Sequence, residues 1–303
     1  MRGLLLFAVL ASFAGAQNQT WIRQFGSAAD DGVGAAAPDG SGGVFVSGWT
    51  SGNLGGPNAG PRDAWLAHYD GAGNQTWIRQ FGTTAWESAF AAAPDGAGGV
   101  FVCGSTLGSL GGPSAGHWDA WLARYDGAGN QTWIRQFGTS DRDQLWAAAP
   151  DGAGGVFVSG YTHGSFGGPS AGSVDAWVAH YDGTGNLTWV RQLGTAGVDQ
   201  AYAAEPDGAG GVYVSGSTRG NLGGPNAGSD DAWLARYDVA GNQTWIRQFG
   251  TSDGERASCS APDGAGGVYV CGFTRGSLGG PNGGRDGAWR AHFDGAGKQT
   301  WIR

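Results

Sequence analysis

The residue that most invites a chemical role in this 303-residue sequence is an acid that recurs at a fixed spacing of 56 positions. The series consists of Asp31, Glu87, Asp143, Asp199 and Glu255. A ring of carboxylates would offer the oxygen ligands that cations prefer. The alternative is structural, because each acid is placed to accept backbone N–H groups or to pair with an arginine of the same repeat. The structural role is favoured, and the sequence predicts neither a metal nor a cofactor.

Catalytic residues are not indicated by the histidines or by any local motif. The five histidines are His68, His117, His163, His180 and His292, and they lack the short spacings of metal ligands. No P-loop or dinucleotide fingerprint is present. Almost every polar group is repeated, whereas a catalytic group is expected to be unique. The sequence therefore predicts that the protein is not an enzyme.

Three cysteines offer redox chemistry, and two of them lie symmetrically about Ala265. Cys259 and Cys271 flank a Gly-rich turn, and residues that oppose each other in a hairpin lie within reach of a disulfide. We expect this bond in an exported protein. The alternative is three small buried thiols. Cys103 replaces Ser47 of another repeat and has no evident partner.

Five asparagines head N-x-T sequons, which are acceptors for N-glycosylation. They are Asn18, Asn74, Asn130, Asn186 and Asn242, and Lys298 interrupts the series. In a eukaryotic secretory pathway these sites would carry glycans. In a bacterium they would be turn residues beside a strand threonine.

The elements that must position these residues follow from one repeat. A T-W-[IV]-R motif recurs every 56 residues without insertion or deletion, at Trp21, Trp77, Trp133, Trp189, Trp245 and Trp301. The repeats span approximately 21–76, 77–132, 133–188, 189–244 and 245–300, within one domain of residues 17–303. Fixed periods of this order are typical of solenoids and propellers.

Each repeat contains four short apolar runs separated by turn signals. In the second repeat the predicted strands a, b, c and d are 88–94, 99–104, 119–125 and 131–137. Gly-rich turns follow strands a and c, and a longer Gly, Pro and Ser segment links b to c. A four-stranded antiparallel meander matches a propeller blade, and the Ala-rich strand a fits the crowded centre. The sequence predicts an all-β, five-bladed β-propeller.

Counting strands leaves one d strand over, namely Thr20 to Phe25. This strand is expected to pair beside, or in place of, the last d strand on blade five, which would close the ring and remove an exposed edge. The alternatives are an incomplete propeller, a gene fragment or a half that dimerises by strand exchange. The protein is therefore expected to be a monomer or a strand-exchanged dimer.

The five repeats differ from one another mainly in three places: the d–a loop, the residues just after strand b and those just before strand c. In a meander all three lie on the same face of the disc, opposite the constant hairpins. Loops on a rigid scaffold carry recognition, and aromatic rings stack on sugars or side chains. The candidate ligand-binding residues are Trp49, Trp86, Trp118, Trp146, Tyr161, Arg219 and Arg275. The alternative is neutral drift of solvent-exposed loops.

The run GGVYVSGSTRG at 210–220, followed by DAWLARYD at 231–238 and GNQTW at 241–245, resembles the SBBP family of bacterial-type β-propeller repeats. The likeness extends over all five repeats. The strand order is also similar to a kelch blade, although the Gly-Gly doublet after strand b is missing. The SBBP resemblance implies an extracellular or envelope-associated propeller and supplies no catalytic residues.

Composition and the N-terminus indicate the compartment. The 62 glycines accompany 40% hydrophobic residues and 15 tryptophans, which is too apolar for a disordered linker. A net charge of −8 makes nucleic acid an unexpected partner. Arg2, the apolar run 4–13 and Ala14-Gly15-Ala16 indicate a signal peptide at residues 1–16, with an N-terminal anchor as the alternative. The mature chain, without a membrane span, is expected to be secreted or associated with the cell surface or envelope.

Three functions are compatible with these features. The first is a secreted binding, adhesion or scaffolding module that engages an extracellular protein or glycan through the variable face. The second is a structural surface or envelope repeat protein without a specific ligand. The third is a hydrolase that acts on polysaccharides.

Overall fold

The computed structural model describes residues 20–303, which form β-strands and turns and contain no helix. The strands make five separate sheets of four antiparallel strands, and the sheets follow one another with the 56-residue period. The prediction of an all-β, five-bladed propeller with four-stranded blades is confirmed. The predicted signal peptide, residues 1–16, lies outside the described residues.

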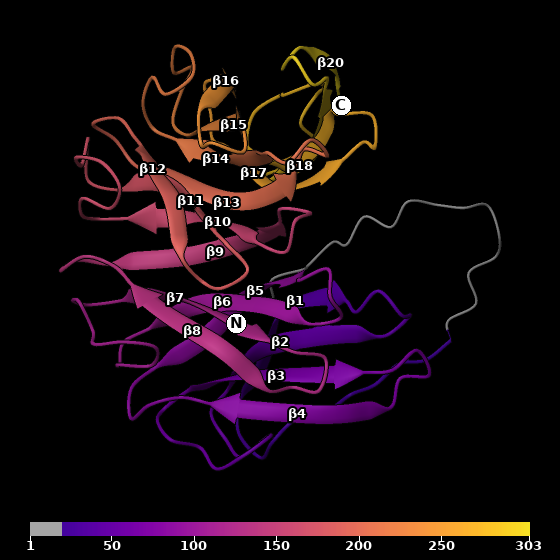
Figure 1. Cartoon of the computed structure of the whole chain (residues 1–303). Coiled ribbons are helices and arrows are strands. Elements are labelled where there is room, and N and C mark those ends of the chain that lie inside the picture. Colours follow the sequence, from indigo (N-terminus) through magenta and orange to yellow (C-terminus); the bar gives the residue numbers. More distant parts are fainter. Residues whose placement is uncertain (1–19) are drawn as a thin grey trace.

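The blades follow the sequence in order (Figure 1). Blade one is β1 (Asp31–Pro38), β2 (Val44–Thr50), β3 (Asp63–Tyr69) and β4 (Gln75–Phe81). Blade two is β5 (Glu87–Pro94), β6 (Val100–Thr106), β7 (Asp119–Tyr125) and β8 (Gln131–Phe137). Blade three is β9 (Asp143–Pro150), β10 (Val156–Thr162), β11 (Asp175–Tyr181) and β12 (Leu187–Leu193). Blade four is β13 (Asp199–Pro206), β14 (Val212–Thr218), β15 (Asp231–Tyr237) and β16 (Gln243–Phe249). Blade five is β17 (Glu255–Pro262), β18 (Val268–Thr274), β19 (Gly287–Phe293) and β20 (Gln299–Ile302).

The constant hairpins are shaped by an aspartate and by glycines with positive φ. In the β5–β6 turn Asp95 accepts hydrogen bonds from the backbone N–H groups of Ala97 (2.8 Å) and Gly99 (2.7 Å). Gly96 and Gly98 adopt φ of 75° and 86°, a region that residues with a Cβ rarely enter. The same Asp-Gly-x-Gly pattern therefore makes the same turn in every blade.

The Ala-rich first strands of successive blades pack against one another, from β1 to β5, β9, β13 and β17. Ala93 and Ala149 are almost completely buried there, which agrees with their predicted place at the crowded centre. The third strands carry the largest buried side chains, Trp65, Trp121, Trp177 and Trp233. Trp121 receives the edge of Phe81 from the preceding blade at 5.5 Å between ring centroids. The core therefore lies between the blades, so each blade depends on its neighbours.

The repeated T-W-[IV]-R motif fastens each outer strand to the next blade. The Trp77 indole covers Gly129 in the β7–β8 turn, and its N–H donates to the carbonyl of Gly127 at 2.9 Å. Arg79 adds a hydrogen bond from Nε to the carbonyl of Gly129 at 3.1 Å. Because Trp and Arg recur in every repeat, one sequence motif makes each junction between neighbouring blades.

The surplus segment lies on blade one and not on blade five. Residues 20–25 form no strand, and the outer strand of blade five is β20. Trp21 covers Gly73 as Trp77 covers Gly129, and Phe25 contacts the ring of Trp65 edge-on at 5.3 Å. The expected pairing of this segment with blade five is therefore corrected: its side chains take the place of an outer strand that would precede blade one.

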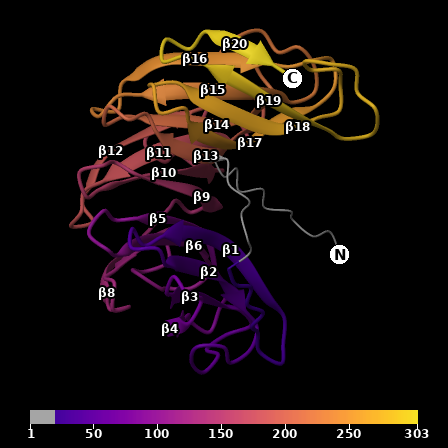
Figure 2. The same ribbon diagram turned by 90° about the vertical axis from the view of Figure 1, so that its right-hand side faces the viewer.

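Within residues 20–303, blades one and five lack the strand packing that joins neighbouring blades, and Figure 2 shows the succession of blades from the side. Their outer faces are consequently exposed. Tyr269 of β18 is 46% exposed, whereas the equivalent Tyr213 of β14 is completely buried. Val33 of β1 is 59% exposed, whereas its counterpart Ala89 is buried. No helix in the described part of the chain could cross a membrane.

Candidate functional site

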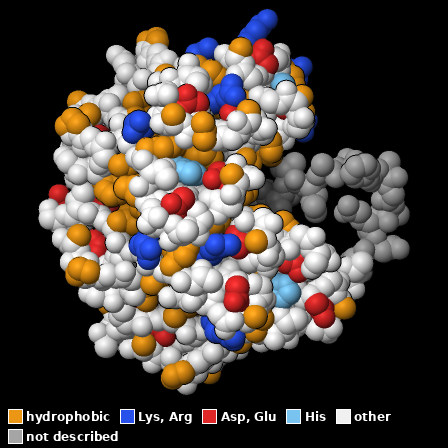
Figure 3. Space-filling view, in the orientation of Figure 1, with side chains coloured by type: hydrophobic (Ala, Val, Ile, Leu, Met, Phe, Trp, Pro, Cys, Tyr) orange, Lys and Arg blue, Asp and Glu red, His pale blue; other side chains and the backbone are white. Residues whose placement is uncertain are grey.

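The d–a loops, the residues after the second strands and the residues before the third strands lie along one edge of the blades, which we call the loop face. Backbone hydrogen bonds join these three variable groups. Trp86 forms an isolated parallel β-bridge with Arg62 of the preceding blade. The backbone carbonyl of Trp86 also accepts a hydrogen bond from the N–H of Leu107 at 2.9 Å. Similar bonds join His163 to Arg142, and Arg219 to Val198. The side of the molecule shown in Figure 3 carries charged side chains of both signs without a single basic patch.

Four of the five recurring acids are buried, Asp31 is half-buried, and all belong to the framework. Glu87 accepts hydrogen bonds from the backbone N–H and the hydroxyl of Thr83 and from the hydroxyl of Thr106, each at 2.7 Å. The acid therefore ties the d–a loop to the second strand, as the structural alternative predicts. The recurring arginines of the outer strands bind the next blade instead of these acids. Residues 20–303 contain no cluster of three or more side chains suited to a metal ion.

A second buried acid, which sequence reasoning did not single out, opens the third strand of blades one to four, and Gly287 takes its place in blade five. Asp119 accepts hydrogen bonds from the N–H of Ala115 (2.8 Å) and the side-chain amide of Gln136 (2.7 Å). Burial raises the pKa of Asp143, and the nearby charge of Asp119 raises it further. Hydrogen bonds donated to Asp143 by Thr162 and Thr139 lower the pKa but do not cancel the rise. The signal was present as the Asp of the D-A-W motif in four of the five repeats, but repetition alone did not distinguish it from a strand cap.

Two predicted ligand residues, Trp49 and Trp86, enclose Arg62 between blades one and two. The guanidinium of Arg62 lies 3.8 Å from the ring centroid of Trp49 and 4.9 Å from that of Trp86. Trp86 is 41% exposed, so one face of this stack borders solvent. Cation–π contacts of this kind contribute about 0.5–2 kcal/mol.

The other predicted aromatic residues lie near blades two and three. Trp146 stacks on Phe90 of the preceding blade at 4.7 Å between centroids. Tyr161 is only 6% exposed, and its hydroxyl donates to Gln144 at 3.2 Å, so it lies beneath the surface. Trp118 is half-buried, and its carbonyl accepts from the N–H of Asp143. These residues share the loop face with Arg62 but do not form one cavity with it.

Arg219 and Arg275, the two predicted basic residues, meet at a pocket of about 150 Å³ between blades four and five. The lining includes Tyr202, Ser217, Arg256 and Phe273. The guanidinium of Arg256 lies 3.3 Å from the ring centroid of Tyr202. Tyr202 and Arg256 were not among the predicted ligand residues, because their meeting depends on the packing of two blades.

The opposite face carries a repeated ion pair. His68 contacts Asp39 at 2.9 Å, and the equivalent pairs are Arg124–Asp95, His180–Asp151, Arg236–Asp207 and His292–Asp263. Burial acts to raise the pKa of Asp39, but hydrogen bonds from His68 and Ser41 hold it well below its ordinary value. His68, His180 and His292 are thus framework residues.

The sequon asparagines occupy the constant turns. The side-chain amide of Asn130 donates to the carboxylate of Asp126 at 2.9 Å, and Asn74, Asn186 and Asn242 make the equivalent bond. Their side chains are exposed, and Asn18 lies outside the described residues. N-glycosylation of these positions stays a prediction.

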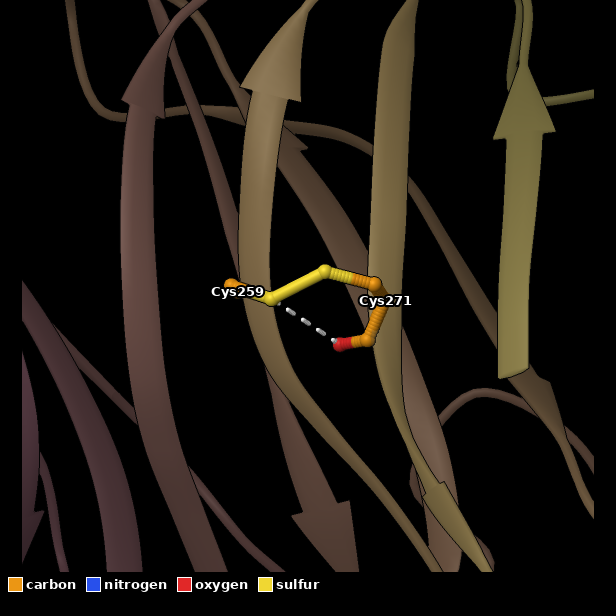
Figure 4. Close-up of a disulfide and its surroundings, with 2 residues drawn as sticks. All are labelled: Cys259 and Cys271. Carbon is orange, nitrogen blue, oxygen red and sulfur yellow. Dashed lines mark hydrogen bonds between the residues drawn. A yellow bond between two sulfur atoms is a disulfide. The ribbon is translucent and has the colours of Figure 1, made fainter. Parts of the chain in front are cut away.

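Cys259 and Cys271 form the expected disulfide across β17 and β18, with Cα atoms 5.3 Å apart (Figure 4). The alternative of three free thiols is therefore wrong. Cys103 is a free, buried thiol, and burial raises its pKa. The disulfide is compatible with an extracellular protein.

Glu205 is a half-buried acid unique to blade four, where the other repeats have Ala37, Ala93, Ala149 and Ala261. It lies on β13 opposite Tyr213. Burial raises the pKa of Glu205 to about 7. Its distinctness from the other repeats is the signal that could have drawn attention to it in the sequence.

Comparisons with known proteins give limited similarity. No protein-family model matches the chain. Regulatory protein FlaEY from Caulobacter vibrioides is 29% identical over 163 residues, which cover 48% of this chain and only 17% of that protein. A protein of unknown function from Bacteroides caccae has a TM-score of 0.48 at 14% identity, over 90% of this chain and 81% of that one. Puromycin hydrolase has a TM-score of 0.42 at 12% identity, over 92% of this chain and 48% of the enzyme.

Proposed function

We propose that the chain is an exported binding module that engages an extracellular glycan or protein through its loop face. The observation that supports this most directly is the division between framework and variation. The recurring acids, the T-W-[IV]-R junctions and the constant hairpins form the framework, whereas the residues that differ between blades border the loop face. A rigid scaffold that presents variable side chains is well suited to recognition.

The SBBP resemblance of the repeats supports an extracellular or envelope setting, and the Cys259–Cys271 disulfide is compatible with it. Repetition of most polar groups favours binding over catalysis, because each acid and histidine of the framework has a structural partner. Regulatory protein FlaEY suggests no function for this chain, because the chain covers only a small part of that protein.

The test is a glycan array together with a panel of extracellular proteins, probed with the purified chain. Trp86→Ala removes an exposed indole from the loop face, and Trp118→Ala alters a second variable position. We expect binding to a subset of ligands, weakened by about 1–3 kcal/mol in at least one variant, which is the range for a partly buried aromatic contact.

Tyr69→Phe is the matched control, because it changes only a hydroxyl that donates to Gln75 away from the loop face. If wild type and both variants bind no glycan or protein of the panel, the binding role is wrong and a structural repeat protein without a specific ligand is supported. Release of products from polysaccharides by the same preparation would instead support a hydrolase.

A further inference from the structure

The pocket between blades four and five has an unusual balance of charge. Arg219 donates from Nε to Asp230 at 2.8 Å, and Arg275 donates from Nε to Asp286 at 3.2 Å. The terminal guanidinium nitrogens of both arginines make no hydrogen bond within residues 20–303. Each aspartate therefore orients an arginine at the rim and leaves the two nitrogens of its fork for a ligand.

Arg256 is the third arginine, and it has no carboxylate partner among residues 20–303. Its Nε is buried without a hydrogen-bond acceptor. The adjacent Glu255 does not compensate for it, because that carboxylate accepts from the hydroxyls of Thr251 and Thr274. Buried charges are ordinarily paired, so an anion bound here would satisfy a group that the protein leaves unsatisfied.

The lining also includes the carboxylates of Asp230 and Glu255, which are already held by Arg219 and by two threonine hydroxyls, and several neutral polar groups. The Tyr202 hydroxyl donates to Gln200 Oε1, and the Ser217 hydroxyl lies 3.4 Å from the same tyrosine oxygen. The side-chain amide nitrogen of Gln200 makes no hydrogen bond within the described residues, so it is a further donor. Phe273, opposite Arg256 in the β17–β18 register, adds an apolar surface.

Size limits the ligand to a small unit. The volume of about 150 Å³ is below the roughly 300–1,000 Å³ of pockets that enclose drug-sized molecules. Planar guanidinium groups match a planar carboxylate through paired hydrogen bonds. Hydroxyl and amide groups beside an aromatic ring suit a sugar ring that carries such a carboxylate.

We propose that this pocket binds one uronic acid residue of an acidic polysaccharide, with the carboxylate held by Arg256 and the rim arginines. The proposal rests on the binding role proposed above and names the ligand class for one part of the loop face. The sugar hydroxyls lie toward Gln200 and Ser217, and the ring edge contacts Phe273.

The test is isothermal titration of the full chain with sodium D-glucuronate, with its methyl ester and with glucose. We expect glucuronate to bind at least about tenfold more tightly than the ester or glucose, a difference of about 1.4 kcal/mol. Ser217→Tyr is the decisive variant. It reproduces the Gln144–Tyr161 pair of blade three, so the blade is expected to fold while the tyrosine ring fills the pocket.

Ser217→Tyr and Arg256→Gln should each weaken glucuronate at least about tenfold. Arg62→Gln, the control, removes another arginine stacked on aromatic rings far from this pocket and should change affinity less than about twofold. The proposal is overturned if glucuronate does not bind, if Ser217→Tyr leaves its affinity unchanged, or if inorganic phosphate or N-acetyl-glutamate binds more tightly. Binding of neutral glycans that depends on Trp86, without binding of glucuronate, would overturn this proposal while supporting the binding role.

Discussion

At the scale of single residues, the positions where one repeat departs from the others are the most informative. Glu205 replaces an alanine that is buried in blades one to three, and burial raises the pKa of Glu205 to about 7. Its ordinary value is 4.5. An acid whose pKa rises on folding costs stability as pH increases from the unfolded value through the folded one.

We therefore expect Glu205→Ala to stabilise the protein mainly above pH 7. The gain approaches about 3 kcal/mol for a rise of this size, and it disappears below about pH 4.5, where the acid is neutral in both states. Thermal unfolding of wild type and variant at pH 4 and pH 8 measures it.

Glu205→Gln is the control, because it retains a polar side chain that does not ionise. Its stability relative to Glu205→Ala should be independent of pH. An equal effect of Glu205→Ala at both pH values would show that lost packing, rather than ionisation, determines the change.

At the scale of elements, each blade junction depends on a glycine in the turn between the third and fourth strands. Gly129 has φ of 78°, and a Cβ added to it would lie 2.7 Å from the ring of Trp77. Gly152 in the β9–β10 turn has φ of 77° but no atom within 4 Å of an added Cβ. The two glycines share a backbone conformation, but only Gly129 is covered by a tryptophan side chain.

Gly152→Ala is expected to cost about 1 kcal/mol of unfolding free energy, which is the backbone penalty alone. Gly129→Ala should cost about 1–3 kcal/mol more, because the added methyl displaces the Trp77 indole. Chemical denaturation of both variants provides the comparison, and equal losses would contradict the role of the indole contact.

At the scale of the whole molecule, stability is distributed over junctions between neighbouring blades. Trp133 packs on Gly185 of blade three and donates to the carbonyl of Gly183 at 3.1 Å. Trp301, the last member of the series, packs on Tyr269 and His292 of its own blade. One tryptophan therefore joins two blades, and the other packs within one.

Trp133→Ala is expected to cost about 3–5 kcal/mol, as for other large core truncations, and Trp301→Ala clearly less. Repeat arrays open locally, so hydrogen exchange resolved by segment is a more suitable measurement than a single melting curve. Faster exchange should spread from blade two into blade three in Trp133→Ala and stay within blade five in Trp301→Ala. Uniform loss of protection in both variants would contradict this distribution.

The sequence alone determined the blade. The 56-residue period, the Asp-Gly-x-Gly turns and the Ala-rich first strand specify four antiparallel strands, because turn chemistry and side-chain alternation are local. The hairpin register likewise placed Cys259 opposite Cys271 and led to the observed disulfide.

Only the tertiary structure decided how blades meet. Residues 20–25 look like an outer strand, yet they lie on blade one, because Trp21 finds a glycine there as the other tryptophans do. The juxtaposition of Tyr202 with Arg256, 54 positions apart, likewise depends on inter-blade packing. Such contacts are non-local, so the loop face could be predicted from the sequence but the pocket within it could not.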